Sequence, residues 1–388
     1  MDAMEDILRK HFDYRNRNSS GSVLGSLFSS IEIKTCDAAY PVSFSDVDIK
    51  YDVGLGVPFA WFWCDAIVEV VENLYRENKK FNGSRDRIVG LLREFLRDEK
   101  NIEHLKKVKS AKSEAEIQAI LSHHLFVLLA PSAEYLIDGH HSWPADLKKC
   151  PACHEDLNLG NTSIGSELLW YGKPDIMVFP LGGSCSIVLP KDKKKEKYID
   201  EEKQLIEVKK ESKLLRGHTN VSQFVSQAVT FSFYQKRFQL RKPKSFPQIV
   251  TMIPTIAISD KCFDVYMYDT ENDILLRNDG DPIPLWNNLD NPCDATLNMG
   301  AVLQLWMLIN HLSVQPNLSQ LELEMFSLTC GFASSLTHER LSRIEKEVKM
   351  RTKFLDHEIK EIKAPKSSFK RKLLNSNKPE KYLPDPTK

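Results

Sequence analysis

Two apolar stretches of the chain contain charged residues where a buried strand is expected. Residues 168–180 read LLWYGKPDIMVFP and residues 204–212 read QLIEVKKES, and both are rich in residues that strands favour. Because side chains of a strand alternate between two faces, Glu207 and Lys209 are expected on the same face. An unpaired buried carboxylate costs several kcal/mol, so the pattern predicts that Asp175, Glu207 and Lys209 pair with one another or with a cation.

Helical periodicity precedes the first stretch, over residues 113–130. Its apolar residues recur every three or four positions, which predicts a core-facing stripe formed by Ile117, Ile120, Leu121, Leu125 and Leu128. Ser113 is a favourable N-cap, and Glu116 occupies the capping-box position. Glu114 lies closer to the stripe than Glu116 does and is the better candidate for a carboxylate near the charged strands, although both residues also suit a helix N-terminus.

The same reading predicts the other elements. Strands are expected at the runs IEIK and VSFSDVDIKYDV within residues 31–53 and at 133–138, 248–260 and 262–270, the last two forming a hairpin. Helices are expected near residues 57–77, 85–99, 219–238, 295–314 and 335–362. Loops are expected at 18–30, 139–166 and 181–203, and the tail from Ala364 onward is expected to be disordered.

Charge and composition narrow the function classes. The chain has 388 residues with 53 basic and 53 acidic side chains, which excludes a uniformly basic nucleic-acid-binding protein. Residues 346–388 nevertheless hold 13 Lys and Arg against 6 Asp and Glu. The N-terminus has no secretory h-region, no stretch suits a membrane span, and the 8 cysteines are scattered. We therefore expect an intracellular protein, nuclear or cytoplasmic, with free thiols and no membrane partner.

A second group of metal-ligating residue types lies in the loop 139–166. Cys150, Cys153 and His154 form a short CPACH run, and His140 and His141 are nearby. Thiolate and imidazole are the ligands that structural zinc prefers, so these residues are candidates for a Zn²⁺ site whose fourth ligand the sequence leaves open. His123 and His124 are expected at the core edge of the helix 113–130 rather than as ligands.

The charged strands resemble the PD-(D/E)XK nuclease superfamily, in which Pro174-Asp175 would match the PD and Glu207-Val208-Lys209 the ExK. The resemblance implies an α/β fold with a restriction-endonuclease-like αβββαβ core and a mixed central sheet. Gln227, one turn before Phe231 in the helix 219–238, resembles a Gln-x-x-x-Tyr element of these nucleases, with Phe in place of Tyr.

The resemblance also implies an activity, Mg²⁺- or Mn²⁺-dependent hydrolysis of nucleic acid, DNA in the first place. Asp175, Glu207 and the Val208 carbonyl would bind the metal, with Glu114 as a further ligand. Lys209 would orient or deprotonate the attacking water, and Gln227 would hold a phosphate or water. Two alternatives stay open: a non-catalytic nucleic-acid-binding or assembly module that keeps the fold, and an unrelated α/β protein in which Glu207 and Lys209 form a cross-strand ion pair.

The implied domain organisation has four parts. Residues 1–109 form an N-terminal extension of short strands and helices, and residues 110–270 form the nuclease-like core with the insertion 139–166. Residues 271–363 form a C-terminal helical region, and residues 364–388 a basic tail. The last helix has a thin apolar stripe, which makes it a candidate surface for a homo-oligomer.

Overall fold

The computed structural model describes the chain from residue 26 to residue 350 with internal gaps. The described residues are 26–36, 47–51, 56–63, 84–132, 134–139, 143–166, 168–179, 185–189, 215, 218–241, 249–288, 295–326 and 329–350. These ranges include both flanks of the expected nuclease-like core, but they do not include residues 204–212.

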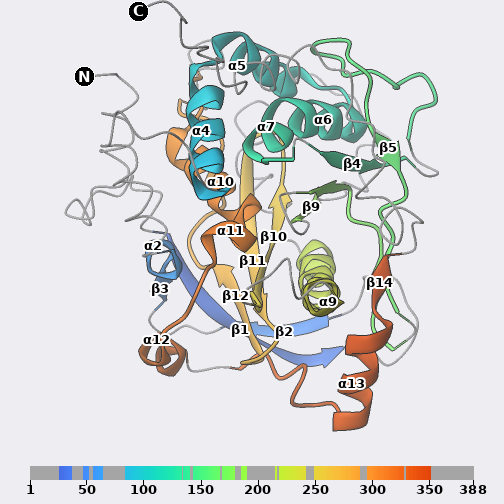
Figure 1. Cartoon of the computed structure of the whole chain (residues 1–388), viewed down its shortest axis with the longest axis vertical. Coiled ribbons are helices and arrows are strands. Elements are labelled where there is room, and N and C mark those ends of the chain that lie inside the picture. Colours follow the sequence, from blue (N-terminus) through green and yellow to red (C-terminus); the bar gives the residue numbers. More distant parts are fainter. Residues whose placement is uncertain are drawn as a thin grey trace, which may run out of the picture. The chain divides into compact units, whose positions relative to one another are not determined.

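A large mixed sheet runs through the described part of the chain (Figure 1). Its order is β2-β1-β12-β11-β10-β9-β8-β4-β5, with β3 paired to β1 and β13 paired to β11. The strands are β1 (Leu27–Cys36), β2 (Val47–Tyr51), β3 (Val57–Pro58), β4 (Tyr135–Asp138), β5 (Leu159–Gly160), β8 (Ile176–Val178), β9 (Cys185–Val188), β10 (Met252–Ile258), β11 (Cys262–Asp269), β12 (Ile274–Asn278) and β13 (Ile283–Pro284).

Strand direction divides this sheet into two antiparallel runs. Strands β4, β8 and β9 are antiparallel neighbours, and so are β10, β11, β12, β1 and β2. The two runs meet where β9 pairs with β10 in parallel, and the helix α9 (His218–Arg241) connects them as a crossover. The expected mixed α/β architecture is confirmed at this level.

Several predicted elements are confirmed. The patterns within 31–53 form β1 and β2, and the hairpin expected at 248–270 is β10 and β11. Strand β1 pairs with β12, so the N-terminal strands extend the main sheet. The helix expected at 113–130 is continuous but changes pitch, with α6 (Glu114–Leu121), a π-helical turn η4 (Ser122–Phe126) and α7 (Val127–Leu129).

Helices cover both faces of the sheet. One face packs in a common apolar core with α2 (Phe59–Phe62), α4 (Ser84–Arg97), α5 (Glu99–Lys106), η3 (Lys107–Ser110), the α6–η4–α7 helix and α10 (Met299–Ile309). The short helices α11 (His311–Val314) and α12 (Gln320–Met325) follow α10. None of the helices in the described ranges is both long and apolar enough to cross a membrane.

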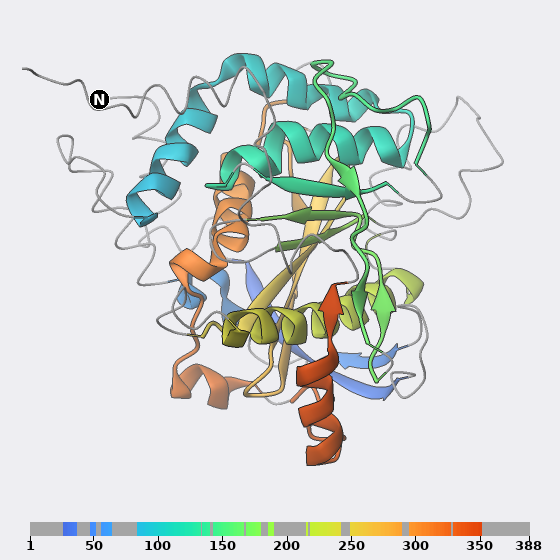
Figure 2. The same ribbon diagram turned by 45° about the vertical axis from the view of Figure 1, so that its right-hand side comes forward.

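The opposite face of the sheet packs against α9. Phe224 of α9 lies 5.7 Å from Tyr266 and Phe233 lies 5.9 Å from Tyr268, measured between ring centroids. Strands β4, β8 and β9 lie between the teal helices α6 and α7 and the yellow-green α9 (Figure 2). The sheet is therefore the middle layer of three.

Three predictions are wrong in the connections. The expected loop 139–166 contains β5, which pairs with β4 in parallel, and β6 (Ile164–Gly165), which pairs with β7 (Tyr171–Gly172). The expected loop 181–203 contains β9, because Cys185–Val188 completes the ladder between β8 and β10. The expected loop 18–30 ends earlier, since β1 begins at Leu27. The strand expected at 204–212 lies outside the described residues.

The C-terminal helix is shorter than predicted. α13 (His338–Glu347) ends before Val348, and Lys349–Met350 forms β14, which pairs with β6 (Ile164–Gly165) and, through it, β7 (Tyr171–Gly172) in a second sheet. Arg237 of α9 donates to the Val348 carbonyl, and Lys236 forms an ion pair with Glu345 at 2.9 Å. α13 therefore packs against α9 of the same chain.

Candidate functional site

Asp175 lies at the point where β8 begins, and its carboxylate is held by the backbone. The residue is 8% exposed. Its Oδ2 accepts a hydrogen bond from the Leu189 amide at 2.8 Å, and its carbonyl accepts one from the Asp138 amide at 3.0 Å. These contacts tie Asp175 to the strands on both sides, β4 and β9. A buried carboxylate whose position is fixed in this way meets the first requirement of a metal ligand.

Gln227 lies on the α9 face of the same strands. Its Nε2 donates to the Ser186 hydroxyl at 2.6 Å, and Ser186 pairs with Thr255 across β9 and β10. Met177 is the partner of Ser186 on β8, so strand alternation places Asp175, two residues earlier, on this face as well. Gln227 is fully buried, and its Oε1 has no hydrogen-bond partner among the described residues. Other buried polar atoms in the described residues also have no hydrogen-bond partner, among them Thr230 Oγ1 of the same helix, so this feature alone does not single out Gln227.

Glu114 does not share this environment. It is the first residue of α6, it is exposed, and its Oε1 accepts a hydrogen bond from Gln118 at 3.0 Å. The cap is as predicted, since the Ser113 side chain accepts from the Glu116 amide. The geometry therefore presents Glu114 as a helix N-terminal carboxylate, and the helix that carries it covers the face opposite α9.

The remaining predicted site residues, Glu207, Val208 and Lys209, lie outside the described residues. The chain enters that segment beside Asp175, because Leu189, which donates to Asp175, is the last described residue of the β9 segment. Strand β8 has β4 on one side and β9 on the other over Ile176–Val178. Both sides of β8 are therefore occupied by described strands over these residues.

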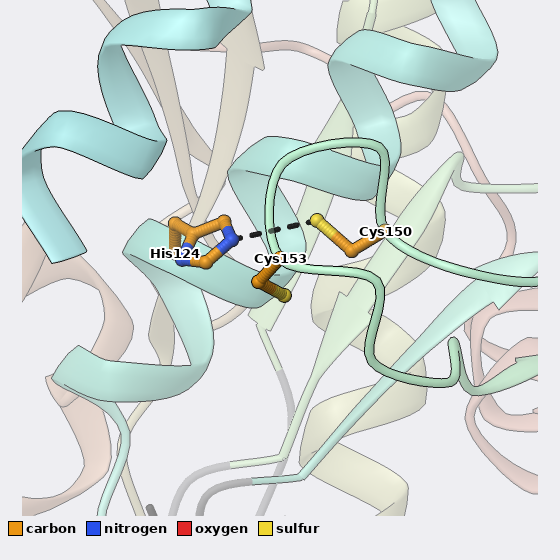
Figure 3. Close-up of side chains that lie close together, drawn as sticks. All are labelled: His124, Cys150 and Cys153. Carbon is orange, nitrogen blue, oxygen red and sulfur yellow. Dashed lines mark hydrogen bonds between the residues drawn. The ribbon is translucent and has the colours of Figure 1, made fainter. Parts of the chain in front are cut away.

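A group able to hold a metal ion is formed by His124, Cys150 and Cys153. One ligand atom of each residue lies within 4.8 Å of the others. The His124 Nε2 is 3.4 Å from the Cys150 Sγ, and the three side chains converge between the helix and a loop (Figure 3). Cys150 is buried completely and Cys153 partly. Cys150 and Cys153, two of the three expected ligands, belong to this group, and the third member is His124 in place of the expected His154.

The loop that carries both thiols is a tight turn closed by backbone hydrogen bonds. The Cys150 amide donates to the Glu155 carbonyl and the His154 amide to the Cys150 carbonyl, both at 2.8 Å. His154 adopts a φ of 64°, the left-handed conformation, and its side chain is exposed. His154 thus closes the turn with its backbone, which brings the two thiols to one side. His140 and His141 lie outside the described residues.

The surroundings suit a thiolate and a neutral imidazole. Hydrogen bonds from Cys150 and His123 lower the pKa of Cys153, whereas Cys150, which donates its proton to Cys153 and is buried, has a raised pKa. Burial lowers the pKa of His124, and the nearby His123 adds to this effect. A deprotonated thiol beside an unprotonated ring is the state that binds zinc.

His124 was missed as a ligand by sequence reasoning because its position fits the apolar stripe of the helix. The contact that indicates a ligand role for His124 is made by Asn101 of α5. Its Oδ1 is 2.7 Å from the His124 Nδ1, and its Nδ2 donates to the His124 carbonyl at 2.8 Å. With Nδ1 donating to Asn101, the His124 Nε2 keeps its lone pair for a metal.

Comparisons of the chain with protein-family models, curated proteins and solved structures found no match.

Proposed function

We propose that the protein is a Mg²⁺-dependent nuclease that hydrolyses phosphodiester bonds of DNA. In this proposal Asp175, Glu207 and the Val208 carbonyl bind the metal, and Lys209 positions the attacking water. Gln227 orients a phosphate or water from α9. Glu114 has no role in this proposal, since its side chain is exposed and its helix covers the sheet face opposite Asp175 and Gln227.

The observation that carries the proposal is the order of elements around Asp175. The helix α6–η4–α7 is followed by β4, then by the short strands β5, β6 and β7, then by β8 and β9, by α9, and by β10 parallel to β9. Strands β4, β8 and β9 form an antiparallel run in the sheet. If the three short strands are assigned to an insertion, this order is compatible with the αβββαβ order that the PD-(D/E)XK resemblance implies, which supports the proposal. Asp175 stands at the start of β8, the second strand of the antiparallel run, where the resemblance requires the metal-binding carboxylate.

One difference favours a second candidate, a non-catalytic nucleic-acid-binding module that keeps the fold. The third strand of the run is β9, with the sequence CSIV, which contains no carboxylate and no amine. In the proposed enzyme, Glu207 and Lys209 reach Asp175 from the segment that follows Leu189. In the non-catalytic module they do not reach it, and nucleic acid binds without cleavage.

We also propose that the metal of His124, Cys150 and Cys153 is Zn²⁺ in a structural role. Two thiolates and an imidazole are soft ligands that select zinc over Mg²⁺. These residues join a loop to the helical layer, whereas Asp175 lies at a strand end with Gln227 on its α9 face, so the two metals serve separate sites.

The test is cleavage of labelled single- and double-stranded DNA and RNA by the purified chain with Mg²⁺, Mn²⁺ or EDTA. The proposal expects cleavage of DNA that requires Mg²⁺ or Mn²⁺ and is lost in Glu207→Gln. Glu345→Gln, which removes a carboxylate paired with Lys236 on α9, serves as the matched control and should cleave normally. Binding without cleavage under all conditions would favour the non-catalytic module.

A further inference from the structure

The three ligands of the proposed zinc site leave one position of a tetrahedral ion to be filled. A structural zinc ion takes four protein ligands, whereas a catalytic one keeps an open position. The candidates in contact with the group are His123, His104 and Glu155. They differ in what they touch, in charge and in the element that carries them.

His123 is the candidate beside the Cys153 thiol, with which it interacts. Its Nε2 lies 3.3 Å from the Oε2 of Glu155, the residue two positions after Cys153. Its ring centroid is 5.1 Å from that of His124. The His104 ring packs edge-on against the His124 ring, with 5.0 Å between the ring centroids, so His104 contacts that ring.

The helix geometry explains how two consecutive residues reach one site. In a regular α-helix, neighbours in sequence project in clearly different directions. His123 and His124 lie in η4, the π-helical turn Ser122–Phe126. A π-bulge widens the turn and is frequent at functional sites. The irregularity in this helix therefore coincides with the two histidines that face the loop.

Charge favours an imidazole over the carboxylate. Zn²⁺ with two thiolates and two neutral imidazoles carries no net charge, whereas Glu155 as the fourth ligand would leave one negative charge at a partly buried site. Glu155 is better suited to a position beside the ligands, where it does not touch the metal. There it can accept a hydrogen bond from the His123 ring, as carboxylates commonly do for zinc-bound histidines.

We infer that His123 is the fourth ligand, so that His123, His124, Cys150 and Cys153 enclose a four-coordinate Zn²⁺ that fastens the loop of residues 143–160 to the helical layer. The inference rests on the proposed zinc site. Lys107 supports the same attachment, since its Nζ donates to the Ala152 carbonyl at 2.9 Å. Tyr135 of β4, whose hydroxyl lies 3.3 Å from the His123 Nδ1, borders the site on the sheet side.

The experiment measures zinc in the full chain and in three histidine variants. The unmodified protein should keep about one zinc ion per chain after desalting. His123→Gln should weaken zinc binding by about a hundredfold. His104→Gln is the matched control from the other ring beside His124, and His154→Asn, which tolerates the left-handed backbone, is the control beside Cys153. Both should retain zinc.

Two results would overturn the inference in distinguishable ways. If His104→Gln loses zinc and His123→Gln keeps it, the fourth ligand is His104 and the zinc site itself stands. If the unmodified protein contains no zinc and shows a Cys150–Cys153 disulfide, the proposed zinc site fails as well. X-ray absorption at the zinc edge of the unmodified protein covers the case of a variant that does not fold. A coordination shell of two sulfurs and two imidazoles in both the unmodified protein and His104→Gln supports His123, and one imidazole with oxygen in the unmodified protein overturns the inference.

Discussion

Asp175 combines a proposed catalytic role with a structural one, and two substitutions separate them. Its Oδ2 accepts the Leu189 amide in a buried place, and an unsatisfied buried amide costs about 1–3 kcal/mol. Asp175→Ala should therefore lower the free energy of unfolding by about that amount. Asp175→Asn keeps an oxygen acceptor and should leave stability nearly unchanged.

Cleavage should nevertheless be lost in both variants, because each removes the metal-binding charge. Urea denaturation without metal, combined with a cleavage assay, checks the prediction. If Asp175→Asn destabilised the chain as much as Asp175→Ala did, the charge of this carboxylate would be structural, as in an ion-pair network.

We predict that the contribution of His311 to the free energy of unfolding is lost in acid. His311 is fully buried, and burial lowers its pKa to about 4 from an ordinary value of 6.5. Because the unfolded chain takes up the proton first, the stability that His311 provides is complete above pH 6.5. This contribution to stability falls as the pH drops from 6.5 through the pKa of His311 in the folded chain, by about 3 kcal/mol at most.

The measurement is the free energy of unfolding between pH 7 and pH 4 for the unmodified chain and for His311→Leu. The variant should have a flatter pH dependence over this window, whatever its absolute stability. Equal slopes in the two proteins would show that His311 does not remain neutral inside the fold.

At the scale of elements, the second sheet depends on one glycine. Gly165 of β6 has a φ of 129°, and a Cβ there would lie 2.3 Å from the Trp170 carbonyl oxygen. A side chain at this position meets both backbone strain and a steric clash. Gly165→Ala should therefore destabilise the chain by about 1–3 kcal/mol and loosen the pairing of β6 with β7 and β14.

Gly280 provides the matched control. A Cβ on Gly280 would come no closer than 3.9 Å to the Asn278 side chain, so Gly280→Ala should be nearly neutral. Thermal unfolding of both variants checks the difference. A neutral Gly165→Ala would mean that the loop between β6 and β7 adapts without cost.

The sequence was most informative where periodicity was long. The apolar stripe of residues 113–130 and the hairpin 248–270 were predicted correctly because burial follows their local period. β9 was missed because only four residues, Cys185–Val188, form it, and their strand state depends on β8 and β10 as neighbours. Local propensity gives weak information about so short a strand.

The candidate metal ligands also differ in how well the local sequence predicts them. The CPACH run predicted Cys150 and Cys153 as candidate ligands, because two thiols in a short loop are recognisable from the local sequence. His124 became visible only when folding brought η4 beside that loop, 26 residues along the chain from Cys150. Spatial neighbours that are distant in sequence have no periodic signature, so a histidine on an apolar helix is interpreted as core.

For the whole molecule, the two proposed metals differ in chemistry, so we predict two separable responses to chelation. A zinc-selective chelator should lower the melting temperature, because zinc bound only by the folded state contributes its binding free energy to folding. Excess Mg²⁺ should not restore it, since thiolates bind Mg²⁺ poorly.

Withholding Mg²⁺ from the zinc-loaded chain should leave the melting temperature almost unchanged and stop cleavage. Differential scanning calorimetry with parallel cleavage assays measures both. A melting temperature that follows Mg²⁺ instead of zinc would mean that the structural metal belongs to the Asp175 site.

The central claim is that Asp175 and the segment containing Glu207 share one metal ion, and metal-directed cleavage of the protein backbone tests it most directly. Fe²⁺ replaces Mg²⁺ in the zinc-loaded chain, peroxide and ascorbate generate radicals at the bound iron, and mass spectrometry locates the cuts. The account predicts cuts near both Asp175 and Glu207 that excess Mg²⁺ suppresses and that Asp175→Asn abolishes. Cuts confined to one of the two segments, or cuts that persist in Asp175→Asn, would contradict it.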